Sequence, residues 1–107
     1  MQQMTVAELA AWIADASRTP PLMLDVREAW EYQTCHIEGA MPIPMNTIPA
    51  RHAELDADAP IVCICHHGAR SMQVAAFLEH HGFTQVANLT GGIHAWAQQI
   101  DSAMPTY

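Results

Sequence analysis

The chain of 107 residues is long enough for one domain, half of its residues are apolar, and no apolar run approaches the roughly 20 residues of a membrane span. Eleven acidic residues against four basic ones give a net charge of -7, which disfavours nucleic acids and anionic membranes as partners, and three cysteines make a disulfide scaffold a poor interpretation. Because the first residues also lack the basic segment of a signal peptide, we expect one soluble, cytoplasmic domain over residues 1–107, monomeric by default for its size.

The first third of the chain predicts a helix, a buried strand and a second short helix. Thr5 and Glu8 form a capping-box pattern, and the apolar residues after them recur at helical spacing, which predicts an amphipathic helix over residues 5–16. The apolar run 22–26 does not alternate with polar residues, as in a strand that is buried on both faces of a parallel sheet. Residues 28–33 are expected to form a helical turn or two.

The middle of the chain predicts the central strand. A glycine and two prolines in 37–44 allow at most a short edge strand there, and 48–55 favours a short helix with a proline near its first turn. Residues 61–65 form the strongest strand signal, so they are expected at the centre of the sheet. A helical pattern follows over 71–81 and ends at Gly82, which suits a left-handed cap.

The last third of the chain predicts one more strand and one more helix. Residues 85–89 favour a short strand, after which Gly91 and Gly92 lead into a helix over 93–100. Short buried strands that alternate with helices indicate an α/β fold with a parallel sheet. No internal repeat and no low-complexity linker interrupts this pattern.

The segment Cys65–Ser71 is the predicted chemical centre, because it joins the central strand to a helix, and ligands bind outside the carboxyl ends of strands in open α/β sheets. A loop that contains Gly68 can turn several backbone N–H groups inward, and the helix after it adds its free N–H groups and the positive end of its dipole. These groups and the charge of Arg70 favour the thiolate form of Cys65. Cys65 is therefore the candidate nucleophile.

Several linked motifs resemble the rhodanese homology family along nearly the whole chain. The first group of motifs is Leu24-Asp25-Val26-Arg27, Glu31-Tyr32 and His36-Ile37-Glu38-Gly39-Ala40. The second group is Cys65-x-x-Gly68-x-Arg70-Ser71, Gly82-Phe83 and Leu89-x-Gly91-Gly92-x-x-x-Trp96. The resemblance implies a small α/β domain with a five-stranded parallel sheet flanked by helices, and a catalytic cysteine that matches Cys65.

The resemblance also implies a sulfurtransferase mechanism. The Cys65 thiolate takes the outer sulfur of a donor such as thiosulfate, releases sulfite and becomes a persulfide, and a thiol of a small molecule or a protein, or cyanide, then removes the terminal sulfur. Arg70 and the two loop histidines are candidates to attract the anionic donor, and no metal and no organic cofactor is expected. The loop amides that are expected to hold the persulfide anion belong to His66, His67, Gly68, Ala69, Arg70 and Ser71.

Two other functions remain open. Cysteine-dependent phosphatases and arsenate reductases use a similar cradle, and related phosphatases share this fold, but they place a longer segment between the cysteine and the arginine. Only residues 66–69 separate Cys65 from Arg70 here, and so short a loop should be too tight for a tetrahedral phosphate. A non-catalytic binding or regulatory module is the second alternative, although such modules commonly lack the cysteine.

The crowding of Cys63, Cys65, His66 and His67 raises the question of a metal site, because thiolates and imidazoles bind zinc and copper. The Cys-x-Cys-His-His run does not match the spacing of zinc ligands. Cys63 lies inside a predicted strand, where it is expected to be a small buried apolar residue. We therefore expect no metal site.

Four residues outside the loop are candidates for supporting roles. Asp25 and Arg27 follow a strand end near the loop and are expected to form an ion-pair network with Glu31 or Arg70 that supports the structure rather than the chemistry. His36 either lines the pocket or forms a hydrogen bond that holds the chain.

Two further positions carry open alternatives. Cys35 stands where the family usually has glycine, which suggests a positive φ, and it is either an inert thiol or a second redox thiol beside Cys65. The tryptophans Trp12, Trp30 and Trp96 are expected in the core, with Trp30 alternatively at the rim of the pocket.

Overall fold

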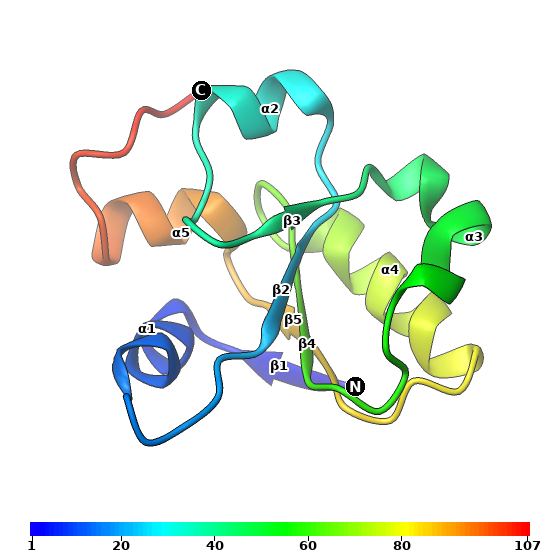
Figure 1. The fold of residues 1–107 in the computed structure, drawn as a ribbon. Coiled ribbons are helices and arrows are strands. Elements are labelled where there is room, and N and C mark those ends of the chain that lie inside the picture. Colours follow the sequence, from blue (N-terminus) through cyan, green and yellow to red (C-terminus); the bar gives the residue numbers. More distant parts are fainter.

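Five parallel strands form a single sheet at the centre of the computed structural model, which describes residues 1–107 (Figure 1). The strands are β1 (Gln2–Met4), β2 (Leu22–Asp25), β3 (Met41–Pro42), β4 (Ile61–Ile64) and β5 (Val86–Leu89). Their order across the sheet is β1-β5-β4-β2-β3, and every neighbouring pair is parallel. The expected α/β fold is confirmed, with β4 as the central strand and β3 as a short edge strand.

Helices cover both faces of this sheet. The α-helices of the protein are α1 (Val6–Ala14), α2 (Ala29–Thr34), α3 (Ile48–Arg51), α4 (Ala69–His80) and α5 (Gly92–Gln99). Helices α1 and α5 lie on one side of the strands, and α3 and α4 lie on the other (Figure 1). No helix has the length and the apolar composition that crossing a membrane requires.

The side chains of β4 fill the core on both faces of the sheet. Val62 and Ile64 pack in the cluster that includes residues of α1 and α5, whereas Ile61 and Cys63 pack in the cluster that includes residues of α4. All four are buried. A strand in this position has no solvent-facing side, so its sequence is a continuous apolar run without alternation.

Local signals place the helix ends, but they do not reveal β1. The Thr5 hydroxyl accepts a hydrogen bond from the Glu8 amide at 3.1 Å, and the Glu8 carboxylate accepts one from the Thr5 amide at 2.9 Å, which confirms the capping box of α1. Gly82 follows α4 with a φ of +91°. Strand β1 has only three residues, and it forms by pairing with β5, where Gln3 lies opposite Asn88.

The start of α5 supports the loop that follows β4. The Ile93 amide donates a hydrogen bond to the Cys65 carbonyl at 2.9 Å, and the His94 amide donates one to the His66 carbonyl at 3.0 Å. Gly92 lies directly against these two carbonyls with a φ of +56°, and a Cβ atom there would collide with both oxygens. The close approach of loop and helix therefore requires glycine at this position.

Replacing Gly92 with alanine is predicted to destabilise the protein more than the same change at Gly82. Both glycines have a positive φ, which costs alanine about 1 kcal/mol, but a Cβ at Gly82 has no neighbour within 4 Å. The collision at Gly92 should cost about 1 to 3 kcal/mol more. Urea unfolding of the two variants measures this difference, and equal losses of stability would contradict the account.

Candidate active site

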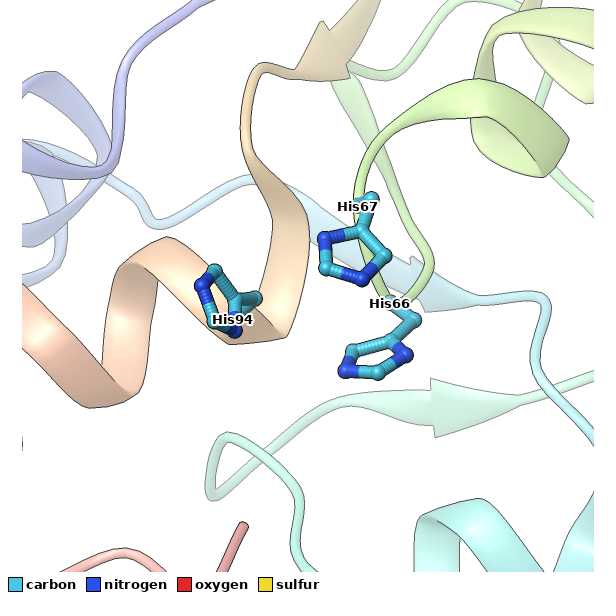
Figure 2. Close-up of side chains that lie close together, drawn as sticks. All are labelled: His66, His67 and His94. Atoms are coloured by element: carbon cyan, nitrogen blue, oxygen red, sulfur yellow. The ribbon is translucent and has the colours of Figure 1, made fainter. Parts of the chain in front are cut away.

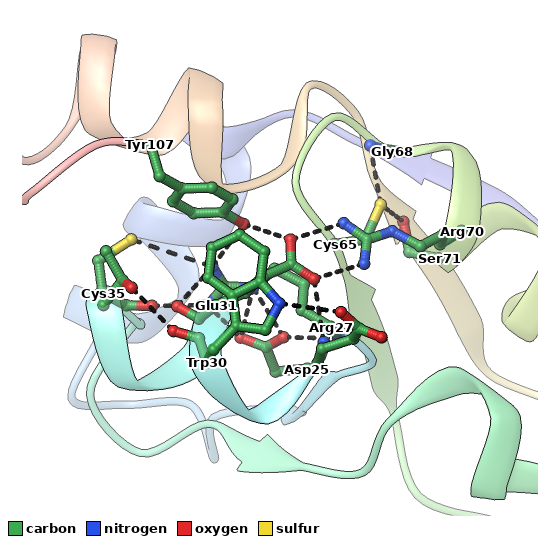
Figure 3. A network of polar contacts seen from close by, with 12 residues as sticks. Asp25, Arg27, Trp30, Glu31, Cys35, Cys65, Gly68, Arg70, Ser71 and Tyr107 are labelled. Atoms are coloured by element: carbon green, nitrogen blue, oxygen red, sulfur yellow. Dashed lines mark hydrogen bonds and ion pairs between the residues drawn. The ribbon is translucent and has the colours of Figure 1, made fainter.

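Cys65 lies at the carboxyl end of the central strand, and its sulfur is held by hydrogen-bond donors. The residue is 1% exposed. Its Sγ accepts a hydrogen bond from the Gly68 amide at 3.0 Å and one from the Ser71 hydroxyl at 3.2 Å (Figure 3). Gly68 has a φ of +112°, and this left-handed turn lets the chain fold back over the sulfur and start α4. The predicted loop therefore wraps the predicted nucleophile.

The rest of the loop carries backbone N–H groups that are not used inside the protein. Apart from Gly68, the loop amides donate no hydrogen bond to any protein acceptor. For Ala69, Arg70 and Ser71 the reason is that the N–H groups in the first turn of a helix have no carbonyl partner within the helix. These free amides belong to His66, His67, Ala69, Arg70 and Ser71. A loop with this many free donors, next to the positive end of the α4 dipole, suits an anion.

The Ser71 hydroxyl lies between two acceptors. It is 3.2 Å from Cys65 Sγ and 2.5 Å from Asn88 Oδ1, and the Asn88 side-chain amide donates in turn to Gln3 Oε1 at 2.9 Å. A hydroxyl has one proton and rotates freely, so Ser71 can donate to the asparagine or to the sulfur. Asn88 was not predicted, although a polar residue inside the buried strand β5 is a signal that the sequence contains.

An ion pair joins the start of α4 to α2. Arg70 donates from Nη1 and Nη2 to the two carboxylate oxygens of Glu31, at 2.6 and 2.8 Å. The hydrogen bonds from Arg70 hold the pKa of Glu31 at about 2, below its usual value of 4.5, and the bond to Glu31 raises the pKa of Arg70. Arg70 therefore lies beside Cys65 as one member of an ion pair and not as a free cation.

A second ion pair is fully buried beneath the first. Arg27 donates to both carboxylate oxygens of Asp25, from Nε at 2.9 Å and from Nη2 at 2.7 Å, and Nη2 also donates to the Cys35 carbonyl at 2.7 Å. Burial lowers the pKa of Arg27, but its hydrogen bonds to Asp25 and Tyr107 outweigh this effect and raise the pKa overall. The expected network of Asp25, Arg27, Glu31 and Arg70 is therefore present, as two ion pairs.

Tyr107 connects the two ion pairs. Its hydroxyl accepts a hydrogen bond from Arg27 Nη1 at 2.9 Å and donates one to Glu31 Oε2 at 2.7 Å (Figure 3). Burial raises the pKa of this hydroxyl to about 12. The Tyr107 ring stacks on the His66 ring, with 4.2 Å between the ring centroids, and lies edge-on to the Trp30 ring, with 5.3 Å between the centroids. Sequence reasoning missed Tyr107, because a residue 76 positions from its partner Glu31 carries no local pattern.

Three further predictions are settled by these positions. Trp30 is 54% exposed and its ring lies edge-on to that of Tyr107, so its expected place in the core is wrong, while its alternative place at the rim of the pocket stays a prediction. His36 is exposed, with Nδ1 2.9 Å from the Tyr32 carbonyl, and it holds the chain rather than lining the loop. Cys35 has a φ of -164°, which is ordinary extended backbone, so the suggestion of a positive φ at this position is wrong.

Cys63 lies in strand β4, whereas His66 and His67 lie in the loop that follows it. Cys63 is fully buried, which confirms its expected position in the core, and burial raises the pKa of its thiol to about 12. His66 and His67 lie with His94 of α5, a residue that the sequence did not single out (Figure 2). Burial, and next the charge of His67, lower the pKa of His66, so this imidazole is a weak source of positive charge for an anionic donor.

Loss of Arg27 is predicted to destabilise the whole protein. Arg27→Ala leaves the buried Asp25 carboxylate without its partner, and breaking a buried pair in this way costs about 3 to 5 kcal/mol. The matched control is Arg51→Ala, which breaks the exposed pair with Glu54 and should change stability by less than about 1 kcal/mol. Similar unfolding midpoints in urea for both variants would refute the structural role of Arg27.

The Glu31–Arg70 pair predicts a pH-dependent contribution to stability. Because the pKa of Glu31 is lower in the folded protein, its contribution is fully present above its ordinary value of 4.5 and is lost as the pH falls towards about 2. Arg70 is one third exposed, so solvent screening limits the contribution to about 1 to 2 kcal/mol.

Urea unfolding of wild type and Glu31→Gln across this pH range measures the effect. The difference in stability should be largest near pH 7 and shrink below pH 4.5. Glu54→Gln, in the exposed pair with Arg51, serves as the control. A Glu31→Gln difference that stays constant down to the lowest pH would contradict the assignment.

Comparison with known proteins identifies relatives of this chain. It matches the family model for the rhodanese-like domain over residues 5–99. It is 42% identical over 77 residues to a protein named sulfurtransferase from Allochromatium vinosum, with 72% of each chain covered. It is 30% identical over 101 residues to the thiosulfate sulfurtransferase GlpE of Stutzerimonas stutzeri, covering 84% of this chain and 93% of GlpE. Some relatives are longer, and the chain spans 26% of the length of two of them.

A solved structure agrees with the sequence matches. The protein SSP1007 of Staphylococcus saprophyticus has a TM-score of 0.83 to this structure at 34% identity, with 99% of this chain and 100% of that chain covered. The chain therefore belongs to the rhodanese-like domain family.

Proposed function

We propose that this protein is a sulfurtransferase that carries a sulfane sulfur as a persulfide on Cys65. The observation that carries the proposal is the environment of the sulfur: Cys65 Sγ accepts hydrogen bonds from the Gly68 amide and the Ser71 hydroxyl, in a loop whose other amides are free. The names of two relatives, a sulfurtransferase and a thiosulfate sulfurtransferase, support the same reaction class.

The first step loads the sulfur. The Cys65 thiolate attacks the outer sulfur of a donor such as thiosulfate, a new S–S bond forms, and the original S–S bond breaks so that sulfite leaves with the electron pair. Negative charge on Cys65 Sγ before the attack is stabilised by the Gly68 amide and by the Ser71 hydroxyl, whose proton turns from Asn88 towards the sulfur. No metal and no organic cofactor takes part.

The second step unloads the sulfur. After the first step the negative charge lies on the outer sulfur, which is bonded to Cys65 Sγ. The free amides of the loop are the donors available to this outer sulfur. A nucleophilic acceptor, either a thiol or cyanide, attacks that outer sulfur and takes it away. The S–S bond electrons return to Cys65 Sγ, which regenerates the thiolate for the next cycle.

The two ion pairs position the loop and do not touch the sulfur. Glu31 occupies both terminal nitrogens of Arg70, and Asp25 binds Arg27 in the buried layer beneath. The pairing of Arg70 with Glu31 also argues against the phosphatase alternative. A phosphate would need hydrogen bonds from both terminal nitrogens of Arg70, and Glu31 already accepts these bonds. A reducing compartment such as the cytoplasm suits three free thiols.

The test is the transfer of one sulfur atom to the intact protein. Thiosulfate should raise the mass of the wild-type protein by one sulfur atom and leave the mass of Cys65→Ser unchanged. The control is Cys63→Ala, which removes a buried thiol without a proposed chemical role and should gain the sulfur as wild type does. Cyanide should then return the mass to its starting value and release thiocyanate. A folded wild-type protein that gains no sulfur from thiosulfate or from other sulfane donors would favour the non-catalytic binding module instead.

A further inference from the structure

Three imidazoles from two separate segments meet beside the Cys65 loop. His66 and His67 belong to the loop, and His94 comes from the first turn of α5 (Figure 2). One ring nitrogen of each lies within 4.8 Å of one ring nitrogen of both others. His66 is partly buried, and His67 and His94 are exposed, so the cluster is open to solvent on one side.

The main chain fixes the two segments of this cluster relative to each other. The His94 amide donates a hydrogen bond to the His66 carbonyl at 3.0 Å, and Gly92 allows the close approach that this bond needs. The His66 ring is stacked between His67 at 4.1 Å and Tyr107 at 4.2 Å. The three side chains therefore start from a rigid backbone, although the loop and α5 are distant in the sequence.

The ring nitrogens of these three histidines are free. Elsewhere in the protein His36, His52 and His81 each place Nδ1 on a backbone carbonyl, at 2.9, 3.1 and 2.8 Å. The rings of the cluster form no hydrogen bond with any protein group, and no acidic side chain belongs to the cluster. Imidazole nitrogens that form no hydrogen bond and lie within 4.8 Å of one another are available as ligands of a transition metal ion.

We propose that His66, His67 and His94 form a binding site for a divalent transition metal ion of the zinc type. Three histidines and one open position are a recognised coordination set for zinc, whereas magnesium and calcium prefer oxygen ligands that this cluster does not offer. Zinc–nitrogen bonds of about 2.0 to 2.1 Å bring the ligand atoms to roughly 3.3 Å from one another. Because the His66 and His67 rings are stacked, binding requires the exposed His67 and His94 rings to rotate until their nitrogens face the ion.

Occupancy of this site should act on sulfur transfer, a consequence that rests on the proposed function. Two of the three ligands directly follow Cys65, and the third belongs to the helix that supports the Cys65 and His66 carbonyls. A bound ion would cross-link the loop to α5 over this segment. We therefore expect zinc to slow the loading of sulfur on Cys65, and a chelator to reverse the effect.

Zinc titration of the metal-free, untagged protein by calorimetry tests the site itself. Wild type should bind one ion per chain, and His94→Ala should weaken binding at least about 10-fold while keeping the backbone bond to His66. His80→Ala, which removes an exposed histidine at the end of α4, is the matched control and should bind as wild type does. Equal affinities of His94→Ala and His80→Ala would overturn the proposal.

Two further measurements separate this site from its alternatives. Cys65→Ser should still bind zinc. If Cys65→Ser loses zinc binding while His94→Ala keeps it, the metal binds to the thiol and the histidine site is refuted. In the loading assay, a zinc concentration that slows wild type should leave His94→Ala at its metal-free rate, and equal inhibition of both would refute the coupling. If wild type never gains sulfur, the proposed function fails, but the titration still decides the metal site.

Discussion

The ion pair between Arg70 and Glu31 is the contact on which the arrangement of the site depends. This ion pair links the first turn of α4 to helix α2. Because α4 directly follows the Cys65 loop, the pair also holds that loop in place. Tyr107 and Arg27 extend the link down to Asp25 at the end of β2. No buried side-chain nitrogen or oxygen is left without a hydrogen-bond partner, so these charges are compensated.

This support leaves the main chain of the loop free for chemistry. The Gly92 contact and the α5 amides hold the carbonyl side of the loop, so its N–H side stays available to a negative sulfur. The backbone donors are therefore in place before a substrate arrives, and the main chain needs no reorganisation when charge develops. The Gly68 amide donates directly to the sulfur, whereas the guanidinium of Arg70 donates to Glu31, which balances its charge.

The sequence predicts the parts of this site that depend on local pattern. The unbroken apolar run 61–65 reveals the central strand, and the loop after it is identified by its place at a strand end and by the motif from Cys65 to Ser71. Tyr107 and His94 escape prediction because their roles arise only from contacts between distant segments. The same limit hides β1, which is defined by its pairing with β5 rather than by its own three residues.

The most direct test of the central claim is a crystal structure of the protein after treatment with thiosulfate. We expect one extra sulfur bonded to Cys65 Sγ, lying within hydrogen-bond distance of the free loop amides between His66 and Ser71. Arg70 should remain paired with Glu31 in that structure. An outer sulfur that points away from the loop amides, or a Cys65 that stays unmodified, would contradict the claim that this loop is built to hold a persulfide.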